Sequence, residues 1–459
     1  MLIRSRREFL KNSLKSITAL GAAGAMAKFG EINAFASGGG PEYQALVCIF
    51  LLGGNDGHNT VIPISTERQN YELYQKGRQS LALTQSSLLP INHGRDAYGL
   101  HPGLADLQKL YIQGKAGILA NVGMLVQPMT RSGFQANNSA RMPVALFSHS
   151  DQASQWQSGV PNGISSTGWG GRIADVLQSQ NSGSSFPSLA ITSSCGIFCT
   201  GQQVLPATIP PAETLSARGT GMATLDAARR TPAIAEAMQQ LLTFDNGLQL
   251  VQADNSIMER GERYANTITG LLANVSIGTP FPEKNKLAAQ LQTVAKIISV
   301  RKQLGLKRQI FFCEMGGFDT HTDQLADHAN LLTNLSQAVG AFYKATEELS
   351  VAEQVTTFTA SEFGRTLSPS SRAGSDHAWG GHHFVIGGTV QGGKIYGEFP
   401  HLALGGDQDA FSRGTLIPTT AVAQYGATLA QWFGVDMSKM PGIFPNIQNF
   451  ASPTLKFLG

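Results

Sequence analysis

The sequence predicts an α/β protein in which helices cover both faces of a parallel sheet. Short apolar runs recur along the chain, and their continuous apolarity is typical of strands buried on both faces. Between these runs lie segments with apolar residues at helical spacing, which indicates amphipathic helices. This alternation defines the α/β class, in which functional sites are expected beyond the carboxyl ends of the strands.

The predicted elements follow in chain order. Short apolar runs predict strands at 46–52, 117–122, 189–192, 309–314, 355–360 and 384–386. Periodicity of 3.6 residues predicts helices at 103–113, 169–177, 323–349 and 420–433, and longer helices within 233–273 and 284–304. Residues from about 200 to 280 contain no histidine or cysteine. We therefore expect a helical insertion around 200–305 within a domain that spans 37–459.

The first 36 residues have the features of a twin-arginine signal peptide. Arg6 and Arg7 precede an Ala/Gly-rich apolar stretch at 17–27, and Ala34-Phe35-Ala36 offers a small-x-small cleavage site. The apolar stretch is shorter than the roughly 20 residues that a membrane span needs. We expect a chain that the twin-arginine translocase exports in folded form, so that it is periplasmic or secreted. A disordered basic tail is the alternative.

The charge balance argues against a nucleic-acid partner. Residues 1–36 contain six Lys/Arg and two Glu, which leaves 28 basic and 29 acidic residues and a formal charge of −1 in the remainder. No basic patch or stripe is evident in that remainder. No other apolar run is long enough to span a membrane, so no transmembrane segment is expected in the mature chain.

The cysteines indicate different environments. Cys48 and Cys313 lie inside apolar runs and are expected to be buried thiols. Cys195 and Cys199 flank three residues of a loop, and in an oxidising compartment they could form a small disulfide.

A glycine-rich motif follows the first predicted strand and contains Asp56. The carboxylate would emerge at the carboxyl end of the strand, where it could bind a metal while Gly53 and Gly54 let the backbone approach a ligand. The alternative is a glycine turn in which Asp56 bonds to its own backbone.

A second motif places hydroxyl groups beside an imidazole. Ser148, His149 and Ser150 precede a predicted short helix, and a nucleophile at a helix N-terminus gains from the local positive potential. Simple capping of the helix by a serine is the alternative.

Carboxylates and imidazoles gather in the last third of the chain. Asp319 and His321 follow one predicted strand through a glycine turn, and Glu362 and Arg365 follow another. Arg365 could hold an oxyanion with two hydrogen bonds or could pair with Glu362. A single loop then carries further candidate ligands. Oxygen and neutral nitrogen ligands suit zinc, manganese or magnesium. The loop residues are Asp376, His377, His382 and His383.

These stretches, in this order and with the leader, resemble an exported bacterial family known as domain of unknown function fifteen-oh-one. The resemblance covers roughly residues 45 to 455 and includes Gly414-Thr415-Leu416-Ile417-Pro418 near the C-terminus. That family is grouped with the alkaline-phosphatase-like superfamily, which includes sulfatases. The resemblance implies a mixed, mostly parallel sheet between helices and a two-metal site at one edge of the sheet.

The resemblance also implies roles for individual residues. Asp56 corresponds to a metal ligand after the first strand, Asp319 and His321 to a later pair, Glu362 to a strand-end acid, and His382 or His383 to a late histidine. The spacing departs from the superfamily because only Thr320 separates Asp319 from His321. Glu362 stands where an Asp-His pair is usual, so that a ligand could come instead from Asp376 and His377. His149 falls at the nucleophile position, and no Cys-x-Pro-x-Arg sulfatase signature occurs.

We therefore expect an exported metal-dependent hydrolase of phosphate or sulfate esters. Ser148 or Ser150 would be the nucleophile, with His149 assisting and Arg365 holding the oxyanion. The substrate would be a small anionic ester or a polysaccharide-type molecule, and the metal would be zinc or manganese, with two ions implied by the superfamily. The alternative is a non-catalytic exported binding protein that retains the fold. The expected metal shell is Asp56, Asp319, His321, Glu362, Asp376, His377, His382 and His383.

Overall fold

The computed structural model describes most of the chain beyond the predicted signal peptide. Three predictions concern residues outside the described ranges and are therefore untested. They are the signal peptide at 1–36, the disulfide that involves Cys195, and nearly all of the helix at 233–273. The described residues are 43–65, 71–94, 96–136, 139–181, 189–191, 197–204, 206–209, 240, 267–268 and 270–459.

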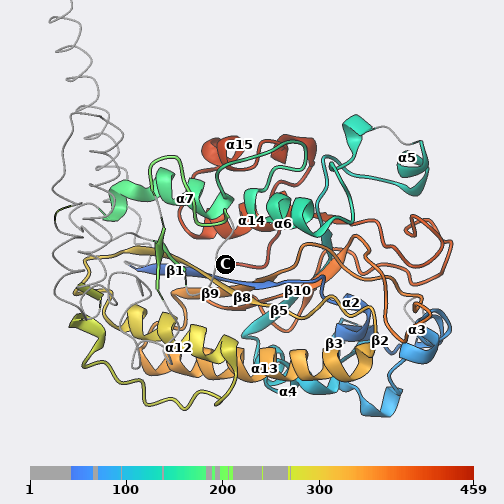
Figure 1. The fold of residues 1–459 in the computed structure, drawn as a ribbon, viewed down its shortest axis with the longest axis horizontal. Coiled ribbons are helices and arrows are strands. Elements are labelled where there is room, and N and C mark those ends of the chain that lie inside the picture. Colours follow the sequence, from blue (N-terminus) through green and yellow to red (C-terminus); the bar gives the residue numbers. More distant parts are fainter. Residues whose placement is uncertain are drawn as a thin grey trace, which may run out of the picture. The chain divides into compact units, whose positions relative to one another are not determined.

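A mixed, mostly parallel sheet forms the centre of the fold (Figure 1). The strand order is β11-β5-β10-β9-β1-β8-β6-β7, and β12 pairs with β5. Strand β1 is parallel to β8 and β9, whereas β10 is antiparallel to β5 and β9. The bounds are β1 Gln44–Leu51, β5 Ala116–Gly123, β6 Leu189–Ile191, β7 Ala207–Thr208, β8 Arg308–Met315, β9 Val355–Ala360, β10 Gly381–Gly387, β11 Ile395–Tyr396 and β12 Thr420–Ala421.

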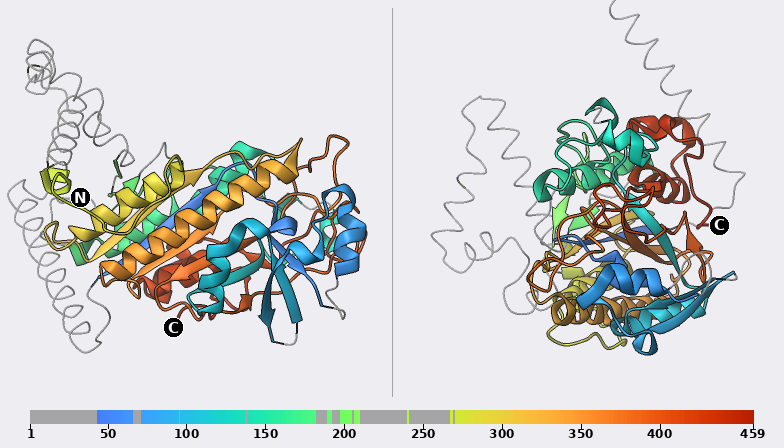
Figure 2. Two further views of the ribbon diagram at one scale, coloured as in Figure 1. Left: turned by 90° about the horizontal axis from the view of Figure 1, so that it is seen from below. Right: turned by 90° about the vertical axis from the view of Figure 1, so that its right-hand side faces the viewer.

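Helices cover both faces of this sheet. Helices α4, α12 and α13 lie on one face, and α6, α7, α14 and α15 lie on the other (Figure 1). Figure 2 shows α12 and α13 side by side along the sheet. The bounds are α2 Gly57–Thr60, α3 Tyr71–Arg78, α4 Ala105–Ile112, α5 Arg131–Gln135, α6 His149–Ser158, α7 Trp169–Leu177, α12 Lys286–Ser299, α13 Gln324–Glu348, α14 Val422–Trp432 and α15 Met440–Ile443.

Strand β1 divides its side chains between two hydrophobic cores. Val47 and Ile49 pack with α12 and α13, whereas Cys48 and Phe50 pack with α7 and α14. Each is at most 1% exposed, and full burial of a large apolar side chain contributes about 1.5–3 kcal/mol. The continuous apolar run is explained by this two-sided burial, and the prediction that Cys48 and Cys313 are buried is confirmed.

A second, smaller sheet packs against α4. Strands β2 (Val61–Pro63), β4 (Asp96–Leu100) and β3 (Leu89–His93) form it in antiparallel order. The apolar pattern of the sequence does not predict this sheet, because its strands are only three to five residues long. Helix α3 follows β2, and its last residue, Arg78, is fully buried.

The central sheet brings distant loops to one edge. Because β1, β8 and β9 are parallel and in register, their carboxyl ends lie together, with Leu51 opposite Met315 and Phe50 opposite Ala360. The loops that follow these strands carry the predicted site residues. Among the described residues, no helix is both long and apolar enough to cross a membrane.

Candidate metal centre

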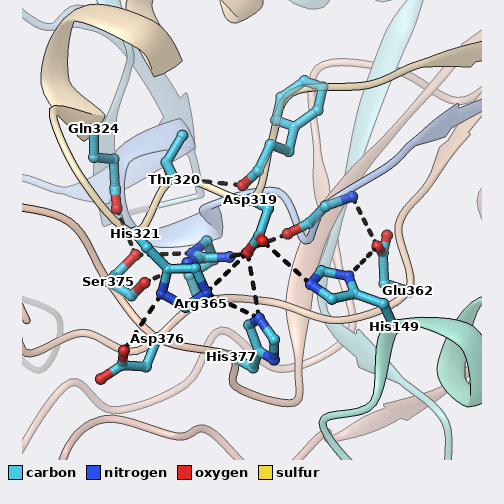
Figure 3. A network of polar contacts seen from close by, with 12 residues as sticks. His149, Asp319, Thr320, His321, Gln324, Glu362, Arg365, Ser375, Asp376 and His377 are labelled. Atoms are coloured by element: carbon cyan, nitrogen blue, oxygen red, sulfur yellow. Dashed lines mark hydrogen bonds and ion pairs between the residues drawn. The ribbon is translucent and has the colours of Figure 1, made fainter.

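Asp319 is the centre of a group of polar side chains at this edge of the sheet (Figure 3). Asp319 and the three histidines that face it, His149, His321 and His377, are called the ring. Asp319 lies on the loop after β8, and its carboxylate faces three imidazoles and one guanidinium. His149 comes from the first turn of α6, His321 from the same loop as Asp319, and His377 from the loop between β9 and β10. Arg365 and His377 are held side by side by an antiparallel backbone bridge.

The Nε2 atoms of the three histidines converge on one carboxylate. Those of His321 and His377 lie 3.1 and 3.2 Å from Oδ1 of Asp319, and that of His149 lies 3.5 Å from Oδ2. The Nε2 atoms of His321 and His377 are 3.1 Å apart. Two nitrogen ligands at about 2.0–2.1 Å from one tetrahedral zinc ion would be about 3.3–3.4 Å apart. The spacing therefore matches the spacing of ligands that share a cation.

The second ring nitrogen of each histidine faces an acceptor. Nδ1 of His149 donates to Oε1 of Glu362 at 2.9 Å, and Nδ1 of His377 donates to the carbonyl of Phe147 at 2.8 Å. Nδ1 of His321 lies 3.5 Å from Oδ1 of Asp376. A carbonyl or carboxylate accepts, so in the neutral ring Nδ1 carries the hydrogen and Nε2 keeps its lone pair toward Asp319. Such outer partners fix ligand histidines in metal sites.

Packing reinforces this orientation. The ring of Phe363 stacks on that of His377 at 4.6 Å and lies 4.8 Å from that of His149. The backbone N–H of Gly53 donates to Glu362 at 2.7 Å, which holds the carboxylate that orients His149. Phe147 has a φ of 73°, an unusual left-handed conformation for a non-glycine residue, in the turn that supplies its carbonyl.

The electrostatics favour an ionised carboxylate beside a neutral imidazole. Burial alone would raise the pKa of Asp319, but the hydrogen bond and charge of Arg365, 2.8 Å from Oδ1, outweigh it and the pKa is lowered. Burial lowers the pKa of His377, despite its hydrogen bond to Phe147. Both groups are therefore in the protonation state that binds a metal.

These residues fit a divalent cation. His149, Asp319 and His377 each offer a ligand atom, and these atoms all lie within 4.8 Å of one another. Nε2 of His149 is buried and has no hydrogen-bond partner among the described residues. His321 is within reach of Asp319 and His377 and is a fourth candidate. The set of nitrogen and oxygen donors is typical of zinc or manganese sites.

Of the eight residues of the predicted metal shell, the structure places five in this ring or in contact with it and leaves three apart. Asp56 is fully buried and pairs with Arg78. His382 accepts a hydrogen bond from the backbone of Asn121 at 3.1 Å, and His383 packs against Trp156 at 4.9 Å. The other predicted residues lie in the ring or contact it directly. They are His149, Asp319, His321, Glu362, Arg365, Asp376 and His377.

The predicted nucleophiles lie beside the ring rather than in it. The hydroxyl of Ser148 donates to Oδ2 of Asp151 at 2.5 Å, and that of Ser150 lies 3.4 Å from the same oxygen. Both contacts are exposed to solvent. Ser148 precedes α6 without capping it through its side chain.

Arg365 has little capacity to hold a substrate anion. Its side chain is fully buried. Its NH1 donates to Asp319 and to the carbonyl of Gly53, and its Nε and NH2 donate to Ser375. The guanidinium contacts Asp319 at 2.8 Å, and the oxyanion contact that the sequence predicted stays a prediction.

Sequence reasoning missed several groups that support the ring. The carbonyl of Phe147 has no sequence signal, because any residue provides one. Gln324 and Ser375 lie near Asp319 and Asp376 in the sequence, but neither type is a usual metal ligand. Arg78 lies on a separate helix with no motif that connects it to Asp56.

Comparison with known families identifies the chain's relatives. A sequence model described as protein of unknown function (DUF1501) matches residues 43–431. The chain belongs to the DUF1501 family. The predicted family is thereby confirmed, and the match includes every residue of the ring. No match was found among curated protein sequences.

Solved structures similar to this DUF1501 protein are distant. Ps i-CgsB is 8% identical over 88% of this chain and 77% of its own, with a TM-score of 0.36. The PsFucS1 sulfatase from Pseudoalteromonas sp. is 10% identical over 95% and 75%, with a TM-score of 0.35. The C-terminal periplasmic domain of EcEptC from Escherichia coli, solved with Zn, is 11% identical over 76% and 74%, at 0.29.

Proposed function

We propose that this protein is a metal-dependent hydrolase of phosphate or sulfate esters. Its cation would be held by His149, Asp319 and His377, with His321 as a fourth ligand. The observation that carries the proposal is the convergence of three Nε2 atoms on one carboxylate, with the Nδ1 atoms of His149 and His377 hydrogen-bonded to fixed acceptors. Fixed tautomers are a feature of metal-ligand histidines.

Solvent access favours a catalytic over a structural metal. The side chains of His149, His321 and Asp319 are 38%, 43% and 44% exposed, so a substrate can reach the ring. Structural zinc sites are closed, whereas catalytic ones keep an open position. A divalent cation there would supply Lewis-acid polarisation of an ester oxygen. A small anionic ester or an anionic group on a polysaccharide is the substrate class that we propose.

Ser148 is the proposed nucleophile. It immediately precedes His149, and its hydrogen bond to Asp151 places a carboxylate where it can accept the hydroxyl proton as a general base. A Ser148→Ala/Ser150→Ala double variant is expected to bind metal like the wild type and to lose ester hydrolysis. Full hydrolysis by this variant would remove Ser148 and Ser150 as nucleophiles.

The metal site itself is tested by metal analysis and turnover. The full chain, freed of metal with a chelator and titrated with Zn²⁺ or Mn²⁺, is expected to bind the ion and to hydrolyse an aryl phosphate or aryl sulfate. His149→Ala and His377→Ala should each weaken binding. His401→Ala is the matched control, since this exposed histidine lies outside the ring. Unchanged metal affinity in both ring variants would refute the site.

A non-catalytic binding protein is the second candidate. One observation favours it. Arg365, the cation in contact with Asp319, is buried and donates to protein acceptors, so it has little capacity to hold the anion of an ester substrate. Metal binding without turnover of any phosphate or sulfate ester would favour this alternative. Turnover that is lost in Asp319→Ala would exclude it.

We also propose export by the twin-arginine route, as the first 36 residues indicate. An Arg6→Lys/Arg7→Lys variant should remain in the cytoplasm while the wild type reaches the periplasm or the medium. Equal distribution of the two proteins would contradict the assignment.

A further inference from the structure

The carboxylate of Asp56 is fully engaged by protein donors. Oδ2 accepts from NH2 of Arg78 and from Nε2 of Gln324, and Oδ1 accepts from the backbone N–H of His58 at 3.1 Å. The side chains of Asp56 and Arg78 are both completely buried. A buried carboxylate with an adjacent guanidinium already has its counter-charge and its hydrogen bonds.

Arg78 is equally fixed. Its Nε donates to the side chain of Asn59 at 2.9 Å, and its NH1 donates to the carbonyls of Thr366 and Leu367 at 2.7 and 3.0 Å. The guanidinium is therefore a permanent part of the core. It is held beside Asp56 by contacts that do not depend on a ligand.

Asp56 is connected to the metal ring by a continuous series of hydrogen bonds. Arg365 donates through Nε to the hydroxyl of Ser375 at 3.0 Å, and that hydroxyl donates to Oε1 of Gln324. Gln324 donates through Nε2 to Asp56, while Arg365 donates through NH1 to Asp319 at 2.8 Å. Figure 3 shows the part of this series from Gln324 through Ser375 and Arg365 to Asp319.

The direction of these bonds is uniform. From Arg365 to Ser375, to Gln324 and to Asp56, each group donates to the next, so the series ends on a negative charge. Such a series is polarised, and each bond strengthens its neighbours. The amide of Gln324 is held in one orientation because only its nitrogen can donate to Asp56.

We propose that Asp56 takes no metal and is a buried anchor that positions Arg365 against Asp319 through Gln324 and Ser375. Arg78 is then the fixed cation beside Asp56, and the ring around Asp319 takes a single ion. This inference rests on the proposed function, in that the ring binds a metal. It replaces the two-ion expectation with one ion per chain.

His382 supports a single ion. Its Nδ1 accepts from the backbone N–H of Asn121, so the neutral ring carries its hydrogen on Nε2 and has no free lone pair. The ring also stacks on Phe399 at 4.7 Å. Two residues of the expected metal shell, Asp56 and His382, are thus committed to protein partners.

The test measures metal stoichiometry and affinity on the full chain. Calorimetric titration of chelator-stripped protein with Zn²⁺ should give one tight site. Gln324→Met, which leaves the Asp56–Arg78 pair in place, should keep one site but weaken it by up to about 10-fold, the lower end of the effect of losing a direct outer partner of a ligand, because Gln324 acts on Asp319 through Ser375 and Arg365. Thr346→Val is the matched control: it removes a buried hydrogen bond, to Tyr343 at 2.6 Å, from the same helix and should leave affinity unchanged.

The Asp56→Asn variant distinguishes an anchoring role of Asp56 from a role as a metal ligand. If Asp56 is an anchor, this variant keeps one ion per chain at reduced affinity. Two ions in the wild type and one in Asp56→Asn would overturn the inference, and so would wild-type affinity in Gln324→Met. Absence of any bound ion would instead refute the proposed function. In that case a crystal structure of Gln324→Met tests the positioning role of Asp56. An Arg365–Asp319 pair in its wild-type position would contradict that role.

Discussion

Acid should destabilise this protein through its buried histidines. Burial is the main cause that lowers the pKa of His58 and His101 to about 4 and that of His328, His382 and His383 to about 3. In the unfolded chain these groups titrate near 6.5. Between about pH 6.5 and 4 the unfolded state therefore binds more protons than the folded state, and the free energy of unfolding falls as the pH falls.

The size of the effect follows from the pKa difference. At pH 5, which is roughly 1.5 units below the pKa of the unfolded histidine, each buried histidine lowers the free energy of unfolding by about 2 kcal/mol, since one pH unit corresponds to about 1.4 kcal/mol. Even two or three such groups would remove a large part of the total stability of a folded protein, which is about 5–15 kcal/mol. Full stability should be present above pH 6.5, and unfolding should occur well before the carboxylates titrate.

Urea unfolding at several pH values between 7 and 4 would measure this loss, with a chelator present so that metal release does not contribute. His383→Phe keeps an aromatic ring against Trp156 and removes one titrating group. Its free energy of unfolding should depend on pH less steeply than the wild type's, by up to about 1.4 kcal/mol per pH unit between pH 4 and 6. A wild-type free energy of unfolding that is the same at pH 7 and pH 5 would refute the reasoning.

Two further predictions concern the metal ring and its scaffold. Zn²⁺ at 100 times its dissociation constant should raise the free energy of unfolding by about 2.7 kcal/mol at pH 7, an effect that thermal denaturation should no longer show in His149→Ala. Gly364→Ala should lower the free energy of unfolding by about 1–3 kcal/mol, because its new Cβ would lie 2.1 Å from the carbonyl oxygen of Gly380. Gly316→Ala, whose Cβ would meet nothing within 4 Å, is the control, and equal stability of the two variants would contradict the clash.

Much of the central sheet could be predicted from the sequence. The apolar runs gave six strands within a few residues of their bounds, because strands buried on both faces leave a strong signal. The antiparallel direction of β10 had no such signal, since direction depends on the path of the loop before it. The small sheet around β4 was missed because short strands carry too few apolar residues to show a period.

The candidate site was only partly predictable. Asp319, His321 and His377 could be grouped because they follow strands whose carboxyl ends share an edge. The burial of His382 and His383 could not be foreseen from residue type, because a strand with both faces covered buries successive side chains. His149 was expected to assist a nucleophile, and its place in the ring depends on Glu362, which is 213 residues away in the sequence.

The four histidine and aspartate side chains of the ring come from three separate parts of the chain, at positions 149, 319–321 and 377. His149 is carried by a helix on one face of the sheet, whereas the others lie on loops beyond β8 and β9. No short fragment can therefore reproduce the ligand set, and an ion can be captured only after the sheet and α6 have assembled. If the ring binds a metal as proposed, acquisition of the ion would follow assembly of the sheet, and the compartment in which the chain folds would decide which ions it meets.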